Sequence, residues 1–149
     1  MAIQVGDKAP EIKSPEFSLA GMKGQRVVVF FFPKADTPGC TKEACEFRDA
    51  QKTFTKKNAA IVGISPDKAA AHEKFAAKYS LPFTLVPDPE HSIAEAYGVW
   101  KEKSMYGRKY MGIERSTFLL DGKGVLRHEW RKVKVPGHAE EVLEAAKSL

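Results

Sequence analysis

The chain contains two cysteines, Cys40 and Cys45, which lie five positions apart. They follow an apolar run, residues 27–32, that predicts a buried strand, and Thr37 stands three positions before the first of them. A single thiol is most often a small core residue. A pair of thiols at a strand-to-helix junction, with a hydroxyl close by, indicates sulfur chemistry: nucleophilic attack, oxidation and disulfide exchange.

A helix beginning near Pro38 would give the two thiols different surroundings. Thr37 is a natural N-cap residue and Pro38 suits the first helical position, so Cys40 would lie in the first turn. Unpaired backbone N–H groups and the positive end of the helix dipole stabilise a thiolate over a thiol there. Cys45 lies more than one turn further on, where this field is weaker. We therefore predict that Cys40 is the nucleophile.

The same helix would hold the two sulfurs apart. Five helical residues separate the Cα atoms of Cys40 and Cys45 by roughly 8.7 Å, which exceeds the limit of ~7 Å for a disulfide. A disulfide between them therefore requires the first turns to unwind, which predicts a folded reduced form and a locally unfolded oxidised form. From these residues alone, a purely structural role for both cysteines remains open.

The elements that position these residues can be predicted from hydrophobic periodicity. Strand-like and helix-like segments alternate over the first two thirds, which indicates βαβ units with parallel strands. The turn residues 121–124 then predict an antiparallel hairpin before a last helix. This order is typical of an α/β, thioredoxin-like fold, a central mixed β-sheet flanked by helices. The expected strands are 27–32, 60–65, 83–86, 116–120 and 125–130; the expected helices are 40–57, 67–79, 91–97 and 136–149.

Length and composition indicate an ordinary globular domain. A chain of 149 residues with 43% hydrophobic and 29% charged side chains can bury a core without crosslinks. Its beginning lacks a basic head followed by an apolar stretch, and no run approaches the roughly 18 apolar residues of a membrane span. We therefore expect a cytoplasmic protein with no membrane partner, in which a disulfide would be transient.

The net charge of +5 comes from 24 basic and 19 acidic residues. Basic residues cluster in 101–115 and 127–134, which we interpret as solvated surface. No nucleic-acid recognition motif accompanies them, so we expect no nucleic-acid partner; attraction of acidic proteins remains an alternative. The four histidines lack metal-ligand spacing with the cysteines, which predicts helix-surface or capping roles and no metal site.

Two separated motifs resemble those of the peroxiredoxins. The pattern Pro33-x-x-x-Thr37-x-x-Cys40 resembles their active-site motif, and the continuation to Cys45 resembles the Q-type, or bacterioferritin comigratory, subfamily. The segment 109–121 resembles the family segment that carries an active-site arginine, here Arg115. The opening residues 5–10 and the late residues 135–138 also fit, so the resemblance covers nearly the whole chain.

The resemblance implies that residues 1–149 are a single thioredoxin-fold peroxiredoxin domain, an antioxidant peroxidase that reduces hydrogen peroxide and organic hydroperoxides. It implies no metal and no cofactor. Cys40 matches the peroxidatic cysteine, and Cys45 matches the resolving cysteine that forms an intramolecular disulfide with it. Thioredoxin, or glutaredoxin in its place, would restore both thiols. For this subtype the resemblance implies a monomer.

Four further residues take roles from the resemblance. Thr37 matches the hydroxyl that hydrogen-bonds peroxide and thiolate, and Pro33 matches the proline that shields the site. Arg115 matches the guanidinium that stabilises the thiolate and polarises the O–O bond. Glu43 corresponds to a carboxylate that orients this arginine. These roles suit the chemistry, because negative charge develops on the departing oxygen.

Two other functions are alternatives to a peroxidase. A thiol–disulfide oxidoreductase acting on proteins would favour Cys-x-x-Cys, and the four-residue gap between Cys40 and Cys45 argues against it. A binding module, for nucleic acid through the basic surface, would show salt-dependent retention on DNA and no thiol oxidation by low peroxide.

Overall fold

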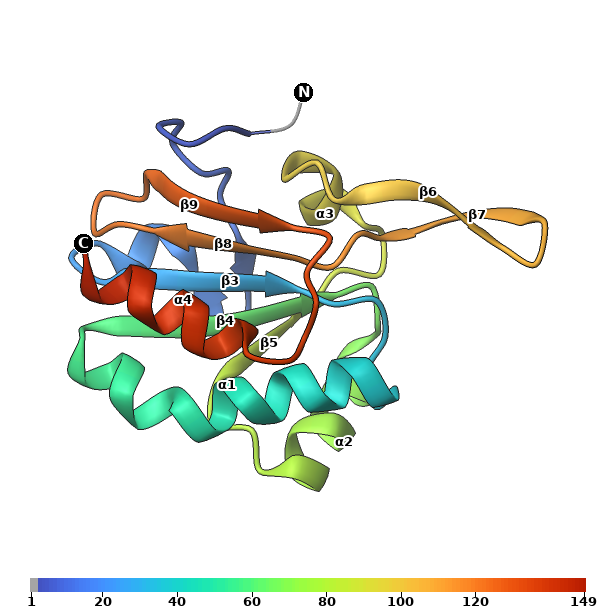
Figure 1. Cartoon of the computed structure of the whole chain (residues 1–149), viewed down its shortest axis with the longest axis horizontal. Coiled ribbons are helices and arrows are strands. Elements are labelled where there is room, and N and C mark those ends of the chain that lie inside the picture. Colours follow the sequence, from blue (N-terminus) through green and yellow to red (C-terminus); the bar gives the residue numbers. More distant parts are fainter. Residues whose placement is uncertain (1–2) are drawn as a thin grey trace.

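The computed structural model describes residues 3–149, and its centre is a five-stranded mixed sheet with the order β5-β4-β3-β8-β9. β3 pairs in parallel with β4 and antiparallel with β8. The helices and the remaining strands surround this sheet (Figure 1). The elements are β1 (Lys13–Ser14), β2 (Phe17–Ser18), the 3-10 helix η1 (Leu19–Met22), β3 (Arg26–Phe31), α1 (Pro38–Lys56), β4 (Ala59–Ser65), α2 (Ala69–Tyr79), β5 (Thr84–Pro87), α3 (Ser92–Ala96), β6 (Trp100–Met105), β7 (Arg108–Ile113), β8 (Ser116–Leu120), β9 (Leu126–Arg131) and α4 (His138–Lys147).

The central strand β3 is buried on both faces, which explains its continuous apolar sequence. Side chains alternate between the faces of a strand. Val28 and Phe30 therefore pack in one core with residues of α1, α2 and α4. Val27, Val29 and Phe31 pack in a second core with the N-terminal segment and residues around α3. The sheet thus separates two hydrophobic layers, and α1 is fixed on the first of them.

The predicted α/β, thioredoxin-like fold with a mixed sheet is confirmed. Each strand and helix expected from the periodicity is present, with ends that differ by a few residues. The sequence analysis did not predict the separate antiparallel hairpin of β6 and β7, which contains most of the basic segment 101–115. This hairpin projects from the body of the molecule at the end of the sheet where α1 begins (Figure 1). Its polar sequence lacks the alternation of apolar and polar residues from which the other strands were predicted.

Within residues 3–149, no helix has the length and apolar character needed to cross a membrane.

Candidate active site

The first cysteine lies where the central strand passes into the first helix. The chain leaves β3 at Phe31, turns through residues 32–37 and enters α1 with Pro38 at its first position. Thr37 has an extended backbone, and its carbonyl accepts the N–H of Thr41 at 2.8 Å, which starts the helix. Cys40 therefore lies in the first turn, as predicted, and its side chain is only 1% exposed.

The side chain of Thr37 does not do what the sequence predicted. The residue occupies the N-cap position, but its hydroxyl makes no capping bond to the helix. The hydroxyl instead donates to the carbonyl of Lys34 at 2.8 Å. Since a hydroxyl has one hydrogen and two lone pairs, this leaves the oxygen of Thr37 free to accept a further hydrogen bond.

Arg115 reaches the cysteine from a distant part of the sequence. It immediately precedes β8, whose first residue Ser116 pairs with Phe31 at the end of β3. The register of the sheet therefore delivers Arg115 to the start of α1. One of its nitrogens, Nη2, donates to Sγ of Cys40 at 3.3 Å.

Glu43 holds the other side of this guanidinium. Its Oε1 accepts from Nη1 of Arg115 at 2.7 Å, and the Glu43 side chain is 1% exposed. The second carboxyl oxygen, Oε2, is buried without a hydrogen-bond partner among the described residues. Cys40 and Glu43 are three positions apart on α1 and so lie on the same face of the helix. The spacing thus lets one arginine contact both side chains.

The charges of this cluster are strongly coupled. Burial raises the pKa of Glu43 to about 7, although the Arg115 charge and hydrogen bond oppose the shift. Burial by itself would lower the pKa of Arg115, but Glu43 and the Cys40 thiolate outweigh it and raise that pKa. Arg115 therefore remains a cation in hydrogen-bond contact with the sulfur of Cys40.

Gly39 makes the close approach of Arg115 possible, and the sequence analysis did not assign it this role. A Cβ atom at position 39 would lie 3.2 Å from Nη2 of Arg115, closer than ordinary side-chain contacts. The only sequence feature that could have indicated this role is the position of a glycine directly before the first cysteine.

Asp67 is a second residue that the sequence analysis missed. Its Oδ2 accepts the backbone N–H of Ala35 at 2.7 Å and the hydroxyl of Ser65 at 2.7 Å. It thereby ties the segment before α1 to the end of β4. The signal was topological: β3 and β4 are parallel neighbours, so the residues that follow them meet at one edge of the sheet.

Two histidines contradict the expectation of surface or capping roles. His72 and His138 are each 4% exposed, and their Nε2 atoms lie 2.6 Å from the hydroxyl of Ser65 and 2.7 Å from that of Thr117. Burial lowers the pKa of both rings. Amphipathic periodicity identified these helices but did not show how deeply they pack.

The remaining predicted residues, Cys45 and Pro33, lie outside this cluster. Cys45 is half-buried on α1, and both cysteines are free thiols. Because α1 is continuous from Pro38 to Lys56, the helix keeps Cys45 at the predicted separation from Cys40. Pro33 is half-buried in the turn between β3 and α1. The structure thus gathers Cys40, Glu43 and Arg115 in direct contact, and it leaves Cys45 outside that contact.

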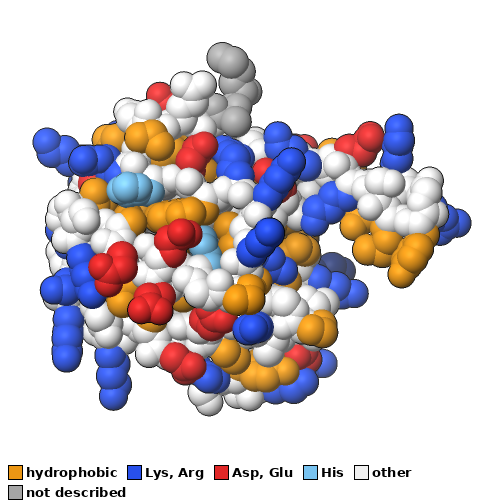
Figure 2. Space-filling model, in the orientation of Figure 1, with side chains coloured by type: hydrophobic (Ala, Val, Ile, Leu, Met, Phe, Trp, Pro, Cys, Tyr) orange, Lys and Arg blue, Asp and Glu red, His pale blue; other side chains and the backbone are white. Residues whose placement is uncertain are grey.

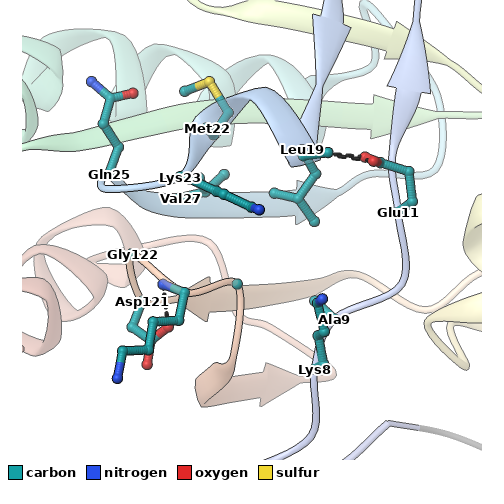
Figure 3. A pocket seen from close by; sticks show the side chains of 13 residues that line it. Lys8, Ala9, Glu11, Leu19, Met22, Lys23, Gln25, Val27, Asp121 and Gly122 are labelled. Carbon is teal, nitrogen blue, oxygen red and sulfur yellow. Dashed lines mark hydrogen bonds between the residues drawn. The ribbon is translucent and has the colours of Figure 1, made fainter.

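A separate cavity of about 270 Å³ lies at the opposite end of β3, between η1 and the turn after β8 (Figure 3). Its lining includes Lys23, Val27 and Asp121, and Val27 pairs with Leu120 at the far end of β8. The cavity is therefore separated from Cys40 by the length of the central strand. Within residues 3–149, no cluster of three or more His, Cys, Asp or Glu side chains is arranged to hold a metal ion.

Comparison with known proteins agrees with this geometry. Residues 5–129 match the AhpC/TSA family. Peroxiredoxin Bcp of Bacillus subtilis is 48% identical over 100% of this chain and 98% of its own length, and Peroxiredoxin Bcp of Escherichia coli is 41% identical over 95% and 94%.

Solved structures give the same result. A PrxQ cysteine mutant from Xylella fastidiosa aligns with a TM-score of 0.91 at 38% identity, covering 99% of this chain and 98% of its own. The bacterioferritin comigratory protein of Xanthomonas campestris, described for its alkyl peroxide reduction activity, aligns with a TM-score of 0.85 at 44% identity over 89% and 84%. The family match and the identity to named peroxiredoxins over nearly the whole chain show that it belongs to the AhpC/TSA family of peroxiredoxins.

Proposed function

We propose that this thiol peroxidase uses Cys40 as its peroxidatic cysteine and Cys45 as its resolving cysteine, and that a thioredoxin-type protein dithiol restores both. The observation that carries the proposal is the hydrogen bond of 3.3 Å from Arg115 to Sγ of Cys40, with Glu43 holding the guanidinium from the other side. A cation that donates to sulfur keeps the nucleophile ionised. The other candidate residues contribute through their positions around this contact.

In the first step, the Cys40 thiolate attacks the hydroxyl oxygen of a hydroperoxide. An S–O bond forms as the O–O bond breaks, so sulfur is oxidised to a sulfenic acid. The other oxygen leaves as hydroxide or alkoxide and takes a proton to become water or an alcohol. Arg115 stabilises the negative charge that develops on this oxygen.

Thr37 has a defined part in this step. Because its hydroxyl hydrogen is donated to the Lys34 carbonyl, its oxygen can accept the O–H of the peroxide. Such a bond would orient the attacked oxygen toward sulfur, and Pro33 on the adjoining turn would limit the access of water. Orientation of this kind lowers the barrier without any change in the nucleophile.

In the second step, the Cys45 thiol condenses with the sulfenic acid. The S–S bond forms, water leaves, and Cys40 is protected from further oxidation. Because the two residues are held apart on α1, its first turns must unwind before this step. We therefore expect faster hydrogen exchange across residues 40–50 in the disulfide form; unchanged protection would contradict the unwinding.

In the third step, a protein dithiol reduces the disulfide. One of its thiolates attacks a sulfur of the Cys40–Cys45 bond and forms a mixed disulfide, and its second thiol then releases the enzyme. The dithiol becomes a disulfide and both enzyme thiols are restored. The overall reaction consumes one hydroperoxide and one dithiol, and it yields an alcohol or water, a further water and a disulfide.

A coupled assay tests the proposal. NADPH consumption through thioredoxin and its reductase is measured with and without hydroperoxide, for the native chain, Cys40→Ser and Cys45→Ser. We expect peroxide-dependent turnover in the native chain and its loss in Cys40→Ser. Cys45→Ser should consume one peroxide per chain and then stop, because its sulfenic acid lacks a resolving thiol.

Three results would contradict the assignments. Turnover by Cys40→Ser would show that another group attacks the peroxide. Full recycling by Cys45→Ser would show that Cys45 is not the resolving thiol. Reduction of insulin disulfides without peroxide turnover would favour a protein disulfide oxidoreductase instead.

A further inference from the structure

The hairpin of β6 and β7 carries almost all the exposed apolar bulk of the protein. Among residues 3–149, five large hydrophobic side chains are exposed, and four of them are on this hairpin: Met105 at 55%, Tyr106 at 99%, Tyr110 at 43% and Met111 at 49%. Figure 2 shows hydrophobic side chains gathered on one side of the projecting hairpin, with Lys and Arg around them. Concentrated exposure of this kind marks an interaction surface.

The fold does not account for this arrangement. β6 and β7 form their own two-stranded sheet, and the cavity at its tip is lined only by residues of the hairpin itself. An isolated hairpin is marginally stable in water. Here its base is anchored by the stacking of Trp100 on His91, with ring centroids 4.0 Å apart, and by the buried Ile113. The base is therefore structural, whereas the tip contributes nothing to the core.

Tyr106 occupies a turn position that an aromatic residue rarely adopts. Tyr106 and Gly107 both have positive φ, 53° and 77°, as the two central residues of a tight hairpin turn require. Asn or Gly is favoured at the first of these positions, and an aromatic residue there is strained. A fully exposed tyrosine in a strained position gains nothing from the fold, which indicates that its ring serves a contact outside the chain.

The hairpin leaves the body of the molecule at the end of the sheet where α1 begins, which is the end that carries Cys40 (Figure 1). Lys103 pairs with Tyr110 and Met105 pairs with Arg108, so these four side chains share a face. Burial and the charge of Arg115 lower the pKa of Lys103, while the Cys40 thiolate opposes the shift. Lys103 is thus within electrostatic reach of the reactive cluster. A partner seated on this face would lie beside the site where α1 begins.

The charge of the hairpin selects the kind of partner. Lys101, Lys103, Arg108 and Lys109 outnumber Glu102, which forms a long ion pair of 3.9 Å with Lys109. An acidic protein surface would be attracted to this hairpin. A second copy of this chain would bring a net charge of +5 and the same basic hairpin, so self-association through this face is opposed by repulsion.

We propose that the β6–β7 hairpin is the docking surface for the protein dithiol that reduces the oxidised enzyme, a partner with an acidic surface and an apolar patch beside its cysteines. This inference rests on the proposed function, because it concerns the recycling step. Tyr106, Met105 and Tyr110 would pack on the apolar patch, and the basic residues would meet its acidic rim. Docking raises the effective concentration of the attacking thiolate near the Cys40–Cys45 disulfide.

The variant Tyr106→Asn tests this surface without disturbing the hairpin. Asparagine suits the positive φ of position 106, so the turn is retained while the exposed ring is removed. Turnover with hydrogen peroxide is measured with an acidic thioredoxin and, separately, with dithiothreitol, which needs no docking surface. We expect kcat/KM for thioredoxin to fall about tenfold, equivalent to ~1.4 kcal/mol, with dithiothreitol-driven turnover unchanged. The matched control is Val5→Ser, which removes the fifth exposed hydrophobic side chain and should alter neither rate.

A charge variant sharpens the result. Arg108→Glu combined with Lys109→Glu should lower kcat/KM for thioredoxin further, and the difference from the native chain should shrink as salt is raised. An unchanged thioredoxin rate in both variants would overturn the proposal. So would an equal loss with dithiothreitol, which would mean that the hairpin acts on the site itself.

Two other outcomes would also overturn it. Sedimentation that reveals a native dimer, dissociated by Tyr106→Asn, would assign the hairpin to self-association. Binding to phosphatidylglycerol vesicles that Tyr106→Asn abolishes, with thioredoxin kinetics unaltered, would assign it to lipid. Absence of peroxide turnover with either reductant in the native chain would instead refute the proposed function.

Discussion

Cys40 and Cys45 share one helix, but the rest of the fold treats them differently. Cys40 is 1% exposed and accepts a hydrogen bond from Arg115, a residue 75 positions away in the sequence. Cys45 is half-buried, and its charged neighbour is Arg48 of the same helix. The pKa of Arg48 is raised mainly by its hydrogen bond to Asp49, with a smaller contribution from Cys45. The first thiol is thus held by a residue from a distant segment, whereas the charged neighbour of the second belongs to its own helix.

This difference suits the two sulfur roles that we propose for one helix. A nucleophile needs preplaced charge and a fixed orientation, which Arg115 and Glu43 supply at Cys40. A resolving thiol needs access after a local opening, so a rigid shell around Cys45 would hinder it. Removing the shell around Cys40 should therefore make its reactivity approach that of Cys45.

The largest expected effect comes from Arg115→Met. Loss of the guanidinium removes the donor to Sγ of Cys40 and the charge that stabilises the departing oxygen. We expect the second-order rate of oxidation by hydrogen peroxide to fall about 100-fold, as for the loss of one preorganised donor. Stopped-flow fluorescence of the reduced enzyme measures this rate. Iodoacetamide labelling of Cys40 should slow toward that of Cys45 in the same chain.

The control for this variant is Arg127→Met, which removes an exposed arginine of β9 paired with Asp121. It should leave both the peroxide rate and the labelling contrast as in the native chain. An Arg115→Met enzyme that keeps more than half of the native rate would refute the electrostatic distinction between the two cysteines.

A smaller, pH-dependent effect is expected from Glu43→Gln. Burial raises the pKa of Glu43 from 4.5 to about 7, so the native carboxyl becomes charged as the pH rises through 7. Above that pH the charge holds Arg115, and glutamine would retain only a neutral acceptor. We expect a peroxide rate about tenfold below native at pH 8, corresponding to ~1.4 kcal/mol, and a difference that shrinks below pH 7. A tenfold difference that persists at pH 6 would contradict this account.

The same shift predicts the pH dependence of stability. A carboxyl whose folded pKa is raised contributes stability that is fully present below its unfolded value, near 4.5, and is lost as the pH rises through about 7. Relative to Glu43→Gln, the native chain should therefore lose stability over this window, on the order of 2–3 kcal/mol. Urea unfolding at pH 5 and pH 8 measures it, and Glu140→Gln, at an exposed position of α4, is the control.

The surroundings of Cys40 show which features of the site could be predicted from the sequence and which could not. The strand 27–32, the helix start at Pro38 and the place of Cys40 in the first turn follow from local patterns, which act over a few residues. The contact of Arg115 with Cys40 needed a family resemblance, because the register between β3 and β8 joins segments that no local rule relates.

Other features escaped prediction for physical reasons of the same kind. The hydroxyl of Thr37 donates to the carbonyl of Lys34 and makes no capping bond to α1, an orientation that belongs to the turn before the helix and that the helix-start pattern does not reveal. The Nε2 atoms of His72 and His138 meet hydroxyls on β4 and β8, and the helix pattern cannot reveal which strand residues a buried ring contacts. The β6–β7 hairpin lacks the alternation of a half-buried strand because most of its length packs against nothing.

The smallest effect should come from Asp67→Ala. This variant tests whether the segment before α1 contributes to the difference in reactivity between Cys40 and Cys45. Asp67 accepts the N–H of Ala35, and its loss leaves that group without its partner. A lost hydrogen bond of this kind costs about 1 kcal/mol, so we expect a few-fold fall in the peroxide rate of Cys40. Condensation with Cys45 should be as fast as in the native chain or faster, because that step needs the same segment to open. Glu144→Ala, an exposed acid on α4, is the control for charge. If oxidation of Cys40 and its condensation with Cys45 slowed together, Asp67 would stabilise the fold in general. The segment before α1 would then not distinguish the two thiols.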